Sequence, residues 1–283
     1  MSDKPRSIRA TRIGGQAYRY LTARPRTGRV VSSFSGGINL LFENGEAFVP
    51  VQTMSVPLHP WAIEIPGEPF HFAEGTPVSV QSGELSVEGT HIVLSTAQVE
   101  ELSLPRFSAH QVLIAQRNFP ILAHFVEEAR NTHPPDPFQP QIDAILTHWH
   151  ESKDPQVLLD LIGLGAGSTP SGDDVLVGIL AGMSLFEHVD DQTRGTLTHL
   201  RIGIQETVSI RTPLPSAQML LAACDLSFTE PILALIKSLT PEGSSEDVLV
   251  EKAQLVTQLG HYSGLAILLG LSGFAHSPAI PSA

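Results

Sequence analysis

Hydrophobic and polar residues alternate over short runs in the first third of the chain, a pattern typical of β-strands with one buried face. Two of these runs flank Asn44-Gly45, a strong reverse-turn signal, so we predict a hairpin within residues 28–51. Further runs between residues 78 and 94 are separated by Ser82-Gly83 and Glu88-Gly89, which predicts a meander. We therefore expect the first third of the chain to consist of strands.

From residue 109 onwards, apolar residues recur at helical spacing. Residues 174–188 are apolar on nearly every side, so we expect this helix to lie at the centre of the helical region. A proline-rich linker is expected over residues 131–140. The other predicted helices span 109–130, 141–151, 193–208, 217–224, 229–239, 245–259 and 262–274. The glycines expected to allow close helix–helix approach are Gly178, Gly182, Gly260 and Gly264.

These patterns predict an α+β fold. A β-rich N-terminal domain of hairpins and a meander should span residues 1–105, and a mostly α-helical C-terminal domain should span residues 106–283. A chain of 283 residues can bury one large core or two modest ones.

Composition narrows the class of protein. A hydrophobic content of 42% with 16% charged residues is typical of a compact globular protein, and the net charge of −12 argues against nucleic acid as the main partner. The single Cys224 excludes an internal disulfide framework, fits a reducing compartment and lies in an apolar run where it should be buried. No apolar run is long enough to span a bilayer or follows the charged N-terminus as a leader would, so we expect a cytoplasmic protein.

Basic residues are concentrated at the N-terminus. Eight of the 17 fall within the first 29 positions, namely Lys4, Arg6, Arg9, Arg12, Arg19, Arg24, Arg26 and Arg29. They form either a solvated face or a strip that meets the acidic remainder, a partner subunit or an anionic substrate.

The most informative stretch is residues 163–174, Gly-Leu-Gly-Ala-Gly-Ser-Thr-Pro-Ser-Gly-Asp-Asp, which precedes the apolar helix. Its glycines allow the main chain to approach a ligand closely. We expect Ser171 or Asp173 to be the N-cap of the helix, since a short oxygen-bearing side chain accepts from the free first-turn N–H groups. Asp173 and Asp174 either serve only as caps, or they belong to a polar nest that holds a small ligand.

Residue types limit that ligand. The loop lacks the Gly-Lys-Ser/Thr ending of a Walker A motif, and no Lys or Arg occurs between Lys153 and Arg194. A bare phosphate would be repelled by the two carboxylates. Three alternatives remain: a divalent cation between the acids and an anion, acids that accept from an amide N–H, or a distant cation such as Arg12, Arg19 or Arg29. A Ser-His-Asp hydrolase is a poor fit, because the Gly-x-Ser-x-Gly pattern is missing at the loop.

A second polar helix start, His261-Tyr262-Ser263-Gly264, opens the last predicted helix. It either faces the glycine loop across a cleft or forms a simple cap and turn. Arg211, followed by Thr212, is one of few cations in this half of the chain, and it is either an anion anchor or an exposed surface charge.

Residues 163–174 resemble the signature Gly-Leu-Gly-x-Gly-Leu-Thr-Pro-Ser-Gly-Asp-Asp of the AllH family. Weaker likeness at residues 260–264 and 34–39 extends the resemblance over most of the chain. The sequence departs from the family pattern at Ser168, where the family has Leu, at Tyr262, where it has Ser, and at Gly36, where an Arg is expected. Residues 211–215 keep one Thr of a family segment and lose its Ser.

The named member of this family is a subunit associated with oxamate carbamoyltransferase in allantoin degradation, a part of purine catabolism. The resemblance implies a transferase subunit for carbamoyl transfer between phosphate and oxamate or a similar small amide, with other subunits of a multi-subunit enzyme as partners. It makes Asp173 and Asp174 the candidate catalytic residues, with Mg²⁺ as an optional cofactor between them. The candidate substrate-binding residues are Gly165, Gly167, Ser168, Thr169, Ser171, Gly172, Arg211, Thr212, His261, Ser263 and Gly264.

Another hypothesis makes the chain a non-catalytic subunit whose loop binds a small metabolite or completes an interface. A stand-alone ligase or kinase-like enzyme that uses Mg²⁺ and a nucleotide is disfavoured by the missing lysine.

Overall fold

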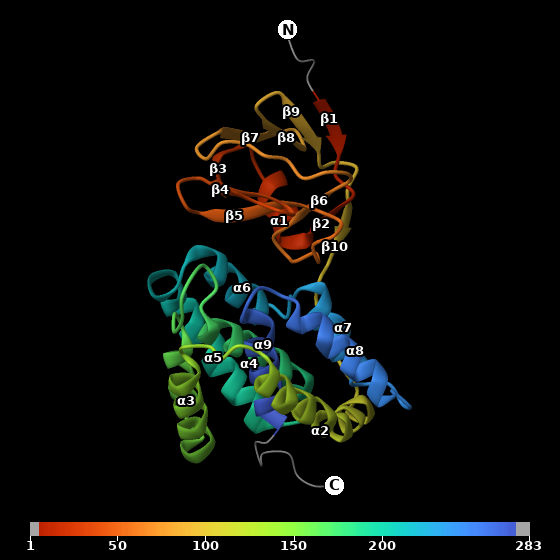
Figure 1. Ribbon diagram of the computed structural model, residues 1–283, viewed down its shortest axis with the longest axis vertical. Coiled ribbons are helices and arrows are strands. Elements are labelled where there is room, and N and C mark those ends of the chain that lie inside the picture. The colour runs from red at the N-terminus through yellow and green to blue at the C-terminus, as the bar shows by residue number, and fades with distance from the viewer. Residues whose placement is uncertain (1–5, 276–283) are drawn as a thin grey trace. The chain divides into compact units, whose positions relative to one another are not determined.

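The computed structural model describes residues 6–275 and divides the chain into two compact units, residues 1–102 and 103–283 (Figure 1). The first unit is a curled sheet and the second is helical, which confirms the predicted α+β class. None of the helices within residues 6–275 is both long enough and apolar enough to cross a membrane.

Strands of the N-terminal unit form one sheet in the order β1-β9-β8-β7-β3-β4-β5-β6-β2-β10. The predicted hairpin is confirmed as the antiparallel pair β4–β5, and the predicted meander as β7–β8–β9. The strand bounds are β1 Arg6–Arg9, β2 Arg12–Gly14, β3 Arg26–Phe34, β4 Gly37–Phe42, β5 Ala47–Thr53, β6 Ile63–Ile65, β7 Pro77–Gln81, β8 Glu84–Val87, β9 Thr90–Val93 and β10 Gln98–Glu100.

The sheet curls because residues 6–14 reach both of its ends. β1 pairs with β9, whereas β2, which follows almost at once, pairs with β6 and β10. A short helix, α1 (Gly15–Thr22), follows β2 and buries Ala17 and Leu21 in the core of this unit. The expectation of strands throughout the first third was therefore wrong at α1, where the four-residue spacing of those two side chains is the helical signal.

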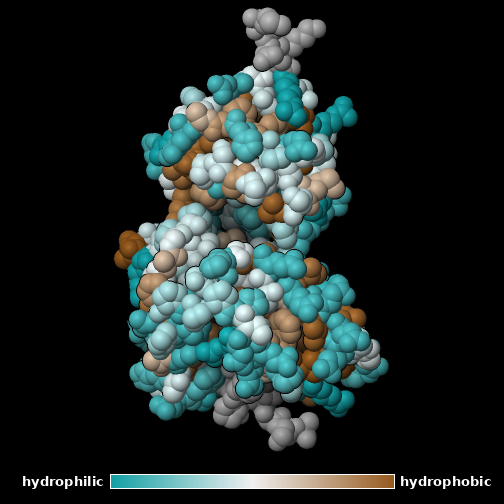
Figure 2. Space-filling view, in the orientation of Figure 1, coloured by the Kyte–Doolittle hydropathy of each residue, from teal (hydrophilic) through white to brown (hydrophobic). Residues whose placement is uncertain are grey.

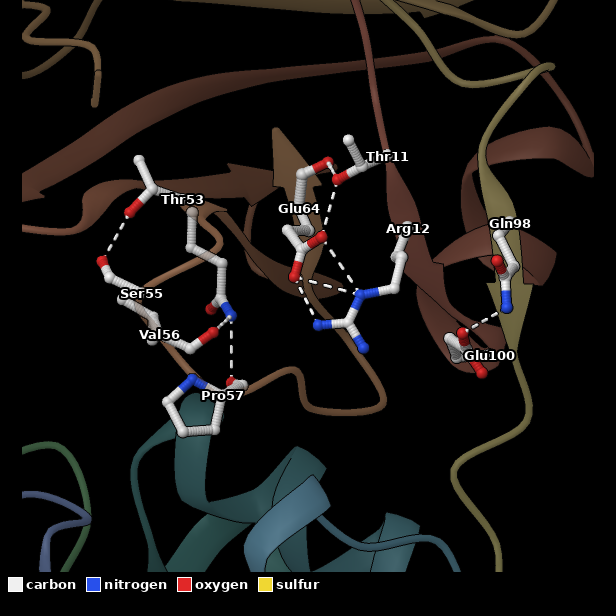
Figure 3. A network of polar contacts seen from close by, with 10 residues as sticks. Thr11, Arg12, Thr53, Ser55, Val56, Pro57, Glu64, Gln98 and Glu100 are labelled. Carbon is white, nitrogen blue, oxygen red and sulfur yellow. Dashed lines mark hydrogen bonds and ion pairs between the residues drawn. The ribbon is translucent and has the colours of Figure 1, made fainter. Parts of the chain in front are cut away.

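A polar row crosses neighbouring strands of this sheet. The register places Glu64 opposite both Arg12 and Gln52. Figure 3 shows Arg12 and Thr11 converging on Glu64: Arg12 Nε donates at 3.1 Å to each carboxylate oxygen, and Thr11 Oγ1 donates to Oε1 at 2.6 Å. Burial alone would raise the pKa of Glu64, but the hydrogen bonds from Arg12 and Thr11 outweigh it and hold that pKa below its ordinary value.

Nearby glutamates pair with two of the basic residues that are concentrated at the N-terminus. Arg12 pairs with Glu64, and Arg19 pairs with Glu101 at 2.8 Å. Both arginines, considered above as cations for the glycine loop, form these ion pairs within the N-terminal unit.

Helices make up the C-terminal unit, and each predicted helix is present. Their bounds are α2 Ala109–Thr132, α3 Gln139–Ser152, α4 Ser171–Phe186, α5 Asp191–Arg211, α6 Leu214–Cys224, α7 Glu230–Ser238, α8 Glu246–Thr257 and α9 Ser263–Ala275, with a 3₁₀ helix, η1, at Pro155–Leu161. Every residue of α4 is buried, which confirms its predicted central place, and Cys224 is buried as expected. Figure 2 shows mostly hydrophilic residues on the visible face of this unit, with smaller hydrophobic patches between them.

Glycines allow α4 and α9 to touch through their main chains. A Cβ atom at Gly178 would lie 2.0 Å from the Ile267 carbonyl oxygen, and one at Gly270 would lie 1.9 Å from that of Val175. At Gly264, a Cβ would lie 2.0 Å from the Val256 oxygen of α8. The predicted close approach is confirmed at Gly178 and Gly264, and it fixes α9 firmly against α4.

Candidate functional site

The glycine loop connects η1 to α4, and three of its glycines have positive φ, including Gly167 at +82°. Gly163 has φ +80° and Gly165 has φ +143°, values that L side chains rarely adopt. A Cβ at Gly163 would also lie 2.1 Å from the Arg211 carbonyl oxygen, and one at Gly165 would lie 2.5 Å from the Ser171 nitrogen. The loop therefore folds tightly against the start of α4 and the end of α5.

The main chain, rather than a side chain, caps α4. Pro170 is the N-cap and makes no side-chain cap hydrogen bond, so the expectation that Ser171 or Asp173 would be the cap was wrong. The Gly172 N–H donates to the Leu164 carbonyl at 2.7 Å, and the Asp173 N–H donates to that of Pro170 at 3.0 Å. Because loop carbonyls satisfy these first-turn donors, the aspartate side chains are available for other partners.

Asp173 fastens the loop to α6 and to the connection between α5 and α6. Its side chain is buried, with 1% exposure. Oδ1 accepts from the Gly163 N–H at 2.8 Å, while Oδ2 accepts from Ser216 Oγ at 2.6 Å and from the Thr212 hydroxyl. Burial raises the pKa of Asp173, and these three donors only partly oppose the rise. The protein's own donors thus occupy this carboxylate.

Asp174 differs from its neighbour because part of its carboxyl group is unsatisfied. The side chain is 8% exposed, and Oδ2 has no hydrogen-bond partner in the described part of the chain. Burial raises the pKa of Asp174 to about 8, a hydrogen bond with Ser263 opposes the rise, and the charges of Asp173 and Asp136 add to it. Asp174 is therefore mostly protonated at neutral pH.

A cavity of about 260 Å³ lies beside these aspartates, within the C-terminal unit. Three segments line it: residues 136–138 before α3, residues 166–169 with Ser171 at the glycine loop, and residues 261–263 at the start of α9. Thr169 Oγ1 and Ser263 Oγ are 3.2 Å apart and form a hydrogen bond between residues 94 positions apart. The two polar helix starts thus meet at one cavity.

A larger groove adjoins the cavity. It has a volume of about 760 Å³ and lies between α2 and α9, and it shares Asp136 and Tyr262 with the smaller cavity. Its walls combine apolar residues such as Val126 and Leu269 with the charged Glu127 and Arg130.

The structure brings some of the candidate substrate-binding residues to the cavity and not others. Those that line it are Gly167, Ser168, Thr169, Ser171, His261 and Ser263. Gly165, Gly172 and Gly264 instead pack closely against main chain, Thr212 bonds to Asp173, and Arg211 Nη1 donates to the Leu159 carbonyl at 2.8 Å. These five lie outside the cavity wall and shape the loop and helices around it.

Sequence reasoning missed the wall formed by residues 136–138. Ala166 and Tyr262, which also line the cavity, lie within the loop and the helix start that the sequence singled out, but they were not among the candidate substrate-binding residues. Asp136 Oδ1 accepts from the Phe138 N–H at 2.8 Å, so this wall is a local turn within the predicted linker. An Asp among prolines was the available signal for a turn, but nothing in the sequence places that turn beside the glycine loop.

The side chains that line the cavity give it an acidic character. Within residues 6–275, none of the residues that line the cavity is Lys or Arg, His261 supplies its basic side chain, and Asp136 contributes a carboxylate. Within residues 6–275, no group of three or more His, Cys, Asp or Glu side chains is arranged to hold a metal ion. Mg²⁺ between Asp173 and Asp174 remains a prediction.

Comparison with known proteins covers both units. Residues 9–101 match the AllH family N-terminal domain, and residues 161–274 match the family described as oxamate carbamoyltransferase subunit AllH. The second match contains the glycine loop, both aspartates and the start of α9, whereas residues 136–138 lie outside it. No curated protein and no solved structure matches the chain. One match covers the sheet and the other covers the glycine loop with the helices that follow it. Together they show that the chain belongs to the AllH family.

Proposed function

We propose that the chain is a carbamoyltransferase subunit that binds a small anion or amide, such as oxamate, in the 260 Å³ cavity. The family description supports the reaction class, and the matched residues supply two of the three cavity walls. The volume lies just below the 300–1,000 Å³ typical of pockets for drug-sized ligands, so it suits a smaller metabolite.

The observation that carries the proposal is the hydrogen bond between Thr169 and Ser263. It joins the two polar helix starts of the family match around a single opening. Small side chains at residues 166–169 leave the main chain accessible there, which is what close contact with a small ligand requires.

Carbamoyl transfer between phosphate and an amide develops negative charge on the carbamoyl oxygen, and it needs fixed hydrogen-bond donors at that oxygen. In our proposal, main-chain N–H groups of the glycine loop and the hydroxyls of Ser168 and Thr169 supply them. Asp174 holds a proton near the reacting groups, while Asp173 positions the loop. The Asp136 carboxylate accepts from the amide nitrogen of the substrate.

Phosphate and carboxylate groups also need positive charge, and among the described residues that line the cavity His261 alone has a basic side chain. We propose that a partner subunit supplies the remaining cations. This requirement agrees with a family described as a subunit rather than as a whole enzyme.

Consumption of carbamoyl phosphate in the presence of oxamate tests the proposal, measured for the purified chain alone and with its partner subunits. Thr169→Val removes the Thr169 hydroxyl from the cavity wall and leaves the volume of the side chain nearly unchanged. It should lower turnover at least tenfold. Thr198→Val, at an exposed threonine of α5, should not change it. Absence of turnover in both settings, together with absence of oxamate binding, would refute the proposal.

A second function, a non-catalytic subunit for metabolite binding or assembly, is favoured by the engagement of Asp173 with three protein donors. Asp174→Asn separates the two. Loss of turnover with assembly and oxamate binding intact indicates a chemical role, whereas loss of assembly indicates a structural one.

A further inference from the structure

The groove of about 760 Å³ beside the cavity has two long walls, each of which is one face of a helix. The residues of these walls recur every three or four positions along the chain, as neighbours on one helical face do. On α2 they are residues 120, 123, 124, 127, 130 and 131, and on α9 and its start they are residues 262, 265, 266, 269, 272 and 273. Each wall spans three helical turns, so the groove is roughly 16 Å long at about 1.5 Å per residue.

One end of the groove meets the proposed substrate cavity. Asp136 and Tyr262 line both, so whatever occupies that end of the groove lies directly beside the cavity. Oxamate and carbamoyl phosphate are small molecules, and the cavity of about 260 Å³ suits them without the groove. The groove is therefore available to a larger occupant that reaches the cavity from the side.

Negative charge in the groove is not balanced by the chain itself. Glu127 on α2 and Asp136 at the cavity end form no ion pair with any described residue, although both line the groove. The groove's arginine, Arg130, is already paired with Asp143 of α3 at 2.8 Å. The groove thus presents two carboxylates that lack a cation, and a basic occupant would complement them.

We infer that the groove is the docking site for a basic segment of a partner subunit, which places a Lys or Arg side chain beside the cavity at Asp136. The inference rests on the proposed function, in which a partner subunit supplies the cations that the anionic substrate needs, and it adds where that partner binds. The match to a family described as a subunit supports a protein occupant.

A protein segment fits the groove better than two other occupants. A small organic cation would pair with Asp136 or Glu127 but would leave the apolar side chains of Val126, Leu265 and Leu269 uncovered. A segment about three helical turns long can cover them and still place a basic side chain at the cavity end. A second copy of this chain fits less well, because its net charge of −12 would bring more negative charge to the two carboxylates.

Photo-crosslinking in the assembled complex identifies the occupant. The full chain carries p-benzoylphenylalanine in place of Ala123 on the groove wall, and it is assembled with the other carbamoyltransferase subunits, irradiated and analysed by peptide mass spectrometry. We expect a crosslinked peptide that comes from another subunit and contains Lys or Arg. The same probe at Leu113, exposed on α2 outside the groove, should not capture that peptide. Crosslinks from position 123 to this chain alone, or none in an assembled complex, would overturn the inference.

Reversal of one charge tests the electrostatic part. Glu127→Arg should weaken association with the other subunits by about tenfold, measured by biolayer interferometry, because it removes a carboxylate from the groove and adds a like charge. Glu128→Arg is the matched control: it alters the next residue of α2, which is exposed and does not line the groove, and it should leave association unchanged. Replacement of the captured basic residue by Glu should restore association with Glu127→Arg. Equal association of Glu127→Arg and Glu128→Arg would overturn the inference.

The docking site and the proposed function can fail separately. A complex that consumes carbamoyl phosphate with oxamate, while its groove captures no peptide of another subunit, would overturn the inference and leave the proposed function standing. A complex whose groove captures the basic peptide, but which neither consumes carbamoyl phosphate nor binds oxamate, would refute the proposed function and still support the docking site.

Discussion

Ser216 Oγ donates to Asp173 Oδ2 at 2.6 Å, and this bond joins the start of α6 to the first turn of α4 across 43 positions of the chain. The same carboxylate holds the Gly163 N–H at the entrance of the glycine loop. Asp173 is thus the point at which the loop, α4 and α6 are fastened together, and the cavity wall depends on it.

Asp173→Asn should lower the free energy of unfolding by about 1–3 kcal/mol, because the amide NH₂ group would face a buried donor that now has no acceptor. Urea denaturation of the full chain measures the change. Asp160→Asn, at an exposed position, should stay within about 0.5 kcal/mol of wild type. Equal stability of the two variants would show that the buried bonds contribute little.

Asp174 should make the protein less stable as pH rises through the neutral range. Its pKa is raised from 3.8 to about 8, so between these values the folded form binds one more proton than the unfolded form. This contribution to stability is full below about pH 4 and is lost as pH approaches about 8, by at most ~1.4 kcal/mol per pH unit. Unfolding free energies measured from about pH 5 to 8 should decline more steeply in wild type than in Asp174→Asn. If the free energy of unfolding declined equally with pH in both proteins, the raised pKa of Asp174 would be contradicted.

Gly178→Ala should destabilise the helical unit by about 1–3 kcal/mol, since the added Cβ would lie 2.0 Å from the Ile267 carbonyl oxygen and force α4 and α9 apart. Gly195→Ala is the matched control: it lies exposed on α5, where an added methyl group would meet no atom within 4 Å, and it should be neutral or stabilising by up to about 1 kcal/mol. Thermal unfolding compares the two. A Gly178→Ala protein as stable as wild type would mean that the helices can separate without loss.

Glu64→Gln should lower the free energy of unfolding of the N-terminal unit by about 2–4 kcal/mol, because Arg12 would lose the buried carboxylate that it contacts. The pKa of Glu64 is lowered, so its contribution to stability is present above the ordinary value of 4.5 and is lost as pH falls further. Hydrogen exchange of β2 and β6 should be faster in Glu64→Gln than in wild type near pH 7. Glu68→Gln, at an exposed site, should leave exchange unchanged.

Local signals predicted the elements well. Asn44-Gly45 has positive φ at both residues and closes the β4–β5 hairpin, as its turn chemistry requires. The uniform apolar character of α4 indicated its central place directly. The helix α1 was not predicted because it has only eight residues. So short a segment between two strands shows too few helical repeats of apolar residues to be distinguished from an irregular connection.

The site was predictable only where it is continuous in sequence. The glycine loop and the start of α9 carry their own polar patterns, but the Thr169–Ser263 hydrogen bond depends on how α4 packs against α9. The N-cap of α4 was predicted wrongly because a main-chain group, the Leu164 carbonyl, accepts from the first turn of the helix. Every residue has such a carbonyl, so the residue types of the loop do not reveal it. The Asp136 wall leads into α3, which packs against η1, and no local pattern encodes that packing.

The cavity has walls of two kinds: the loop and the start of α9 fall within the residues matched to the family, while residues 136–138 do not. Those three residues form a turn that is held by the Asp136–Phe138 hydrogen bond and leads directly into α3, with Phe138 as its N-cap, whereas close main-chain contacts constrain Gly163 and Gly165 of the loop. Ligand preference can therefore diverge by substitution in this turn alone, while the opposite side of the opening keeps its shape.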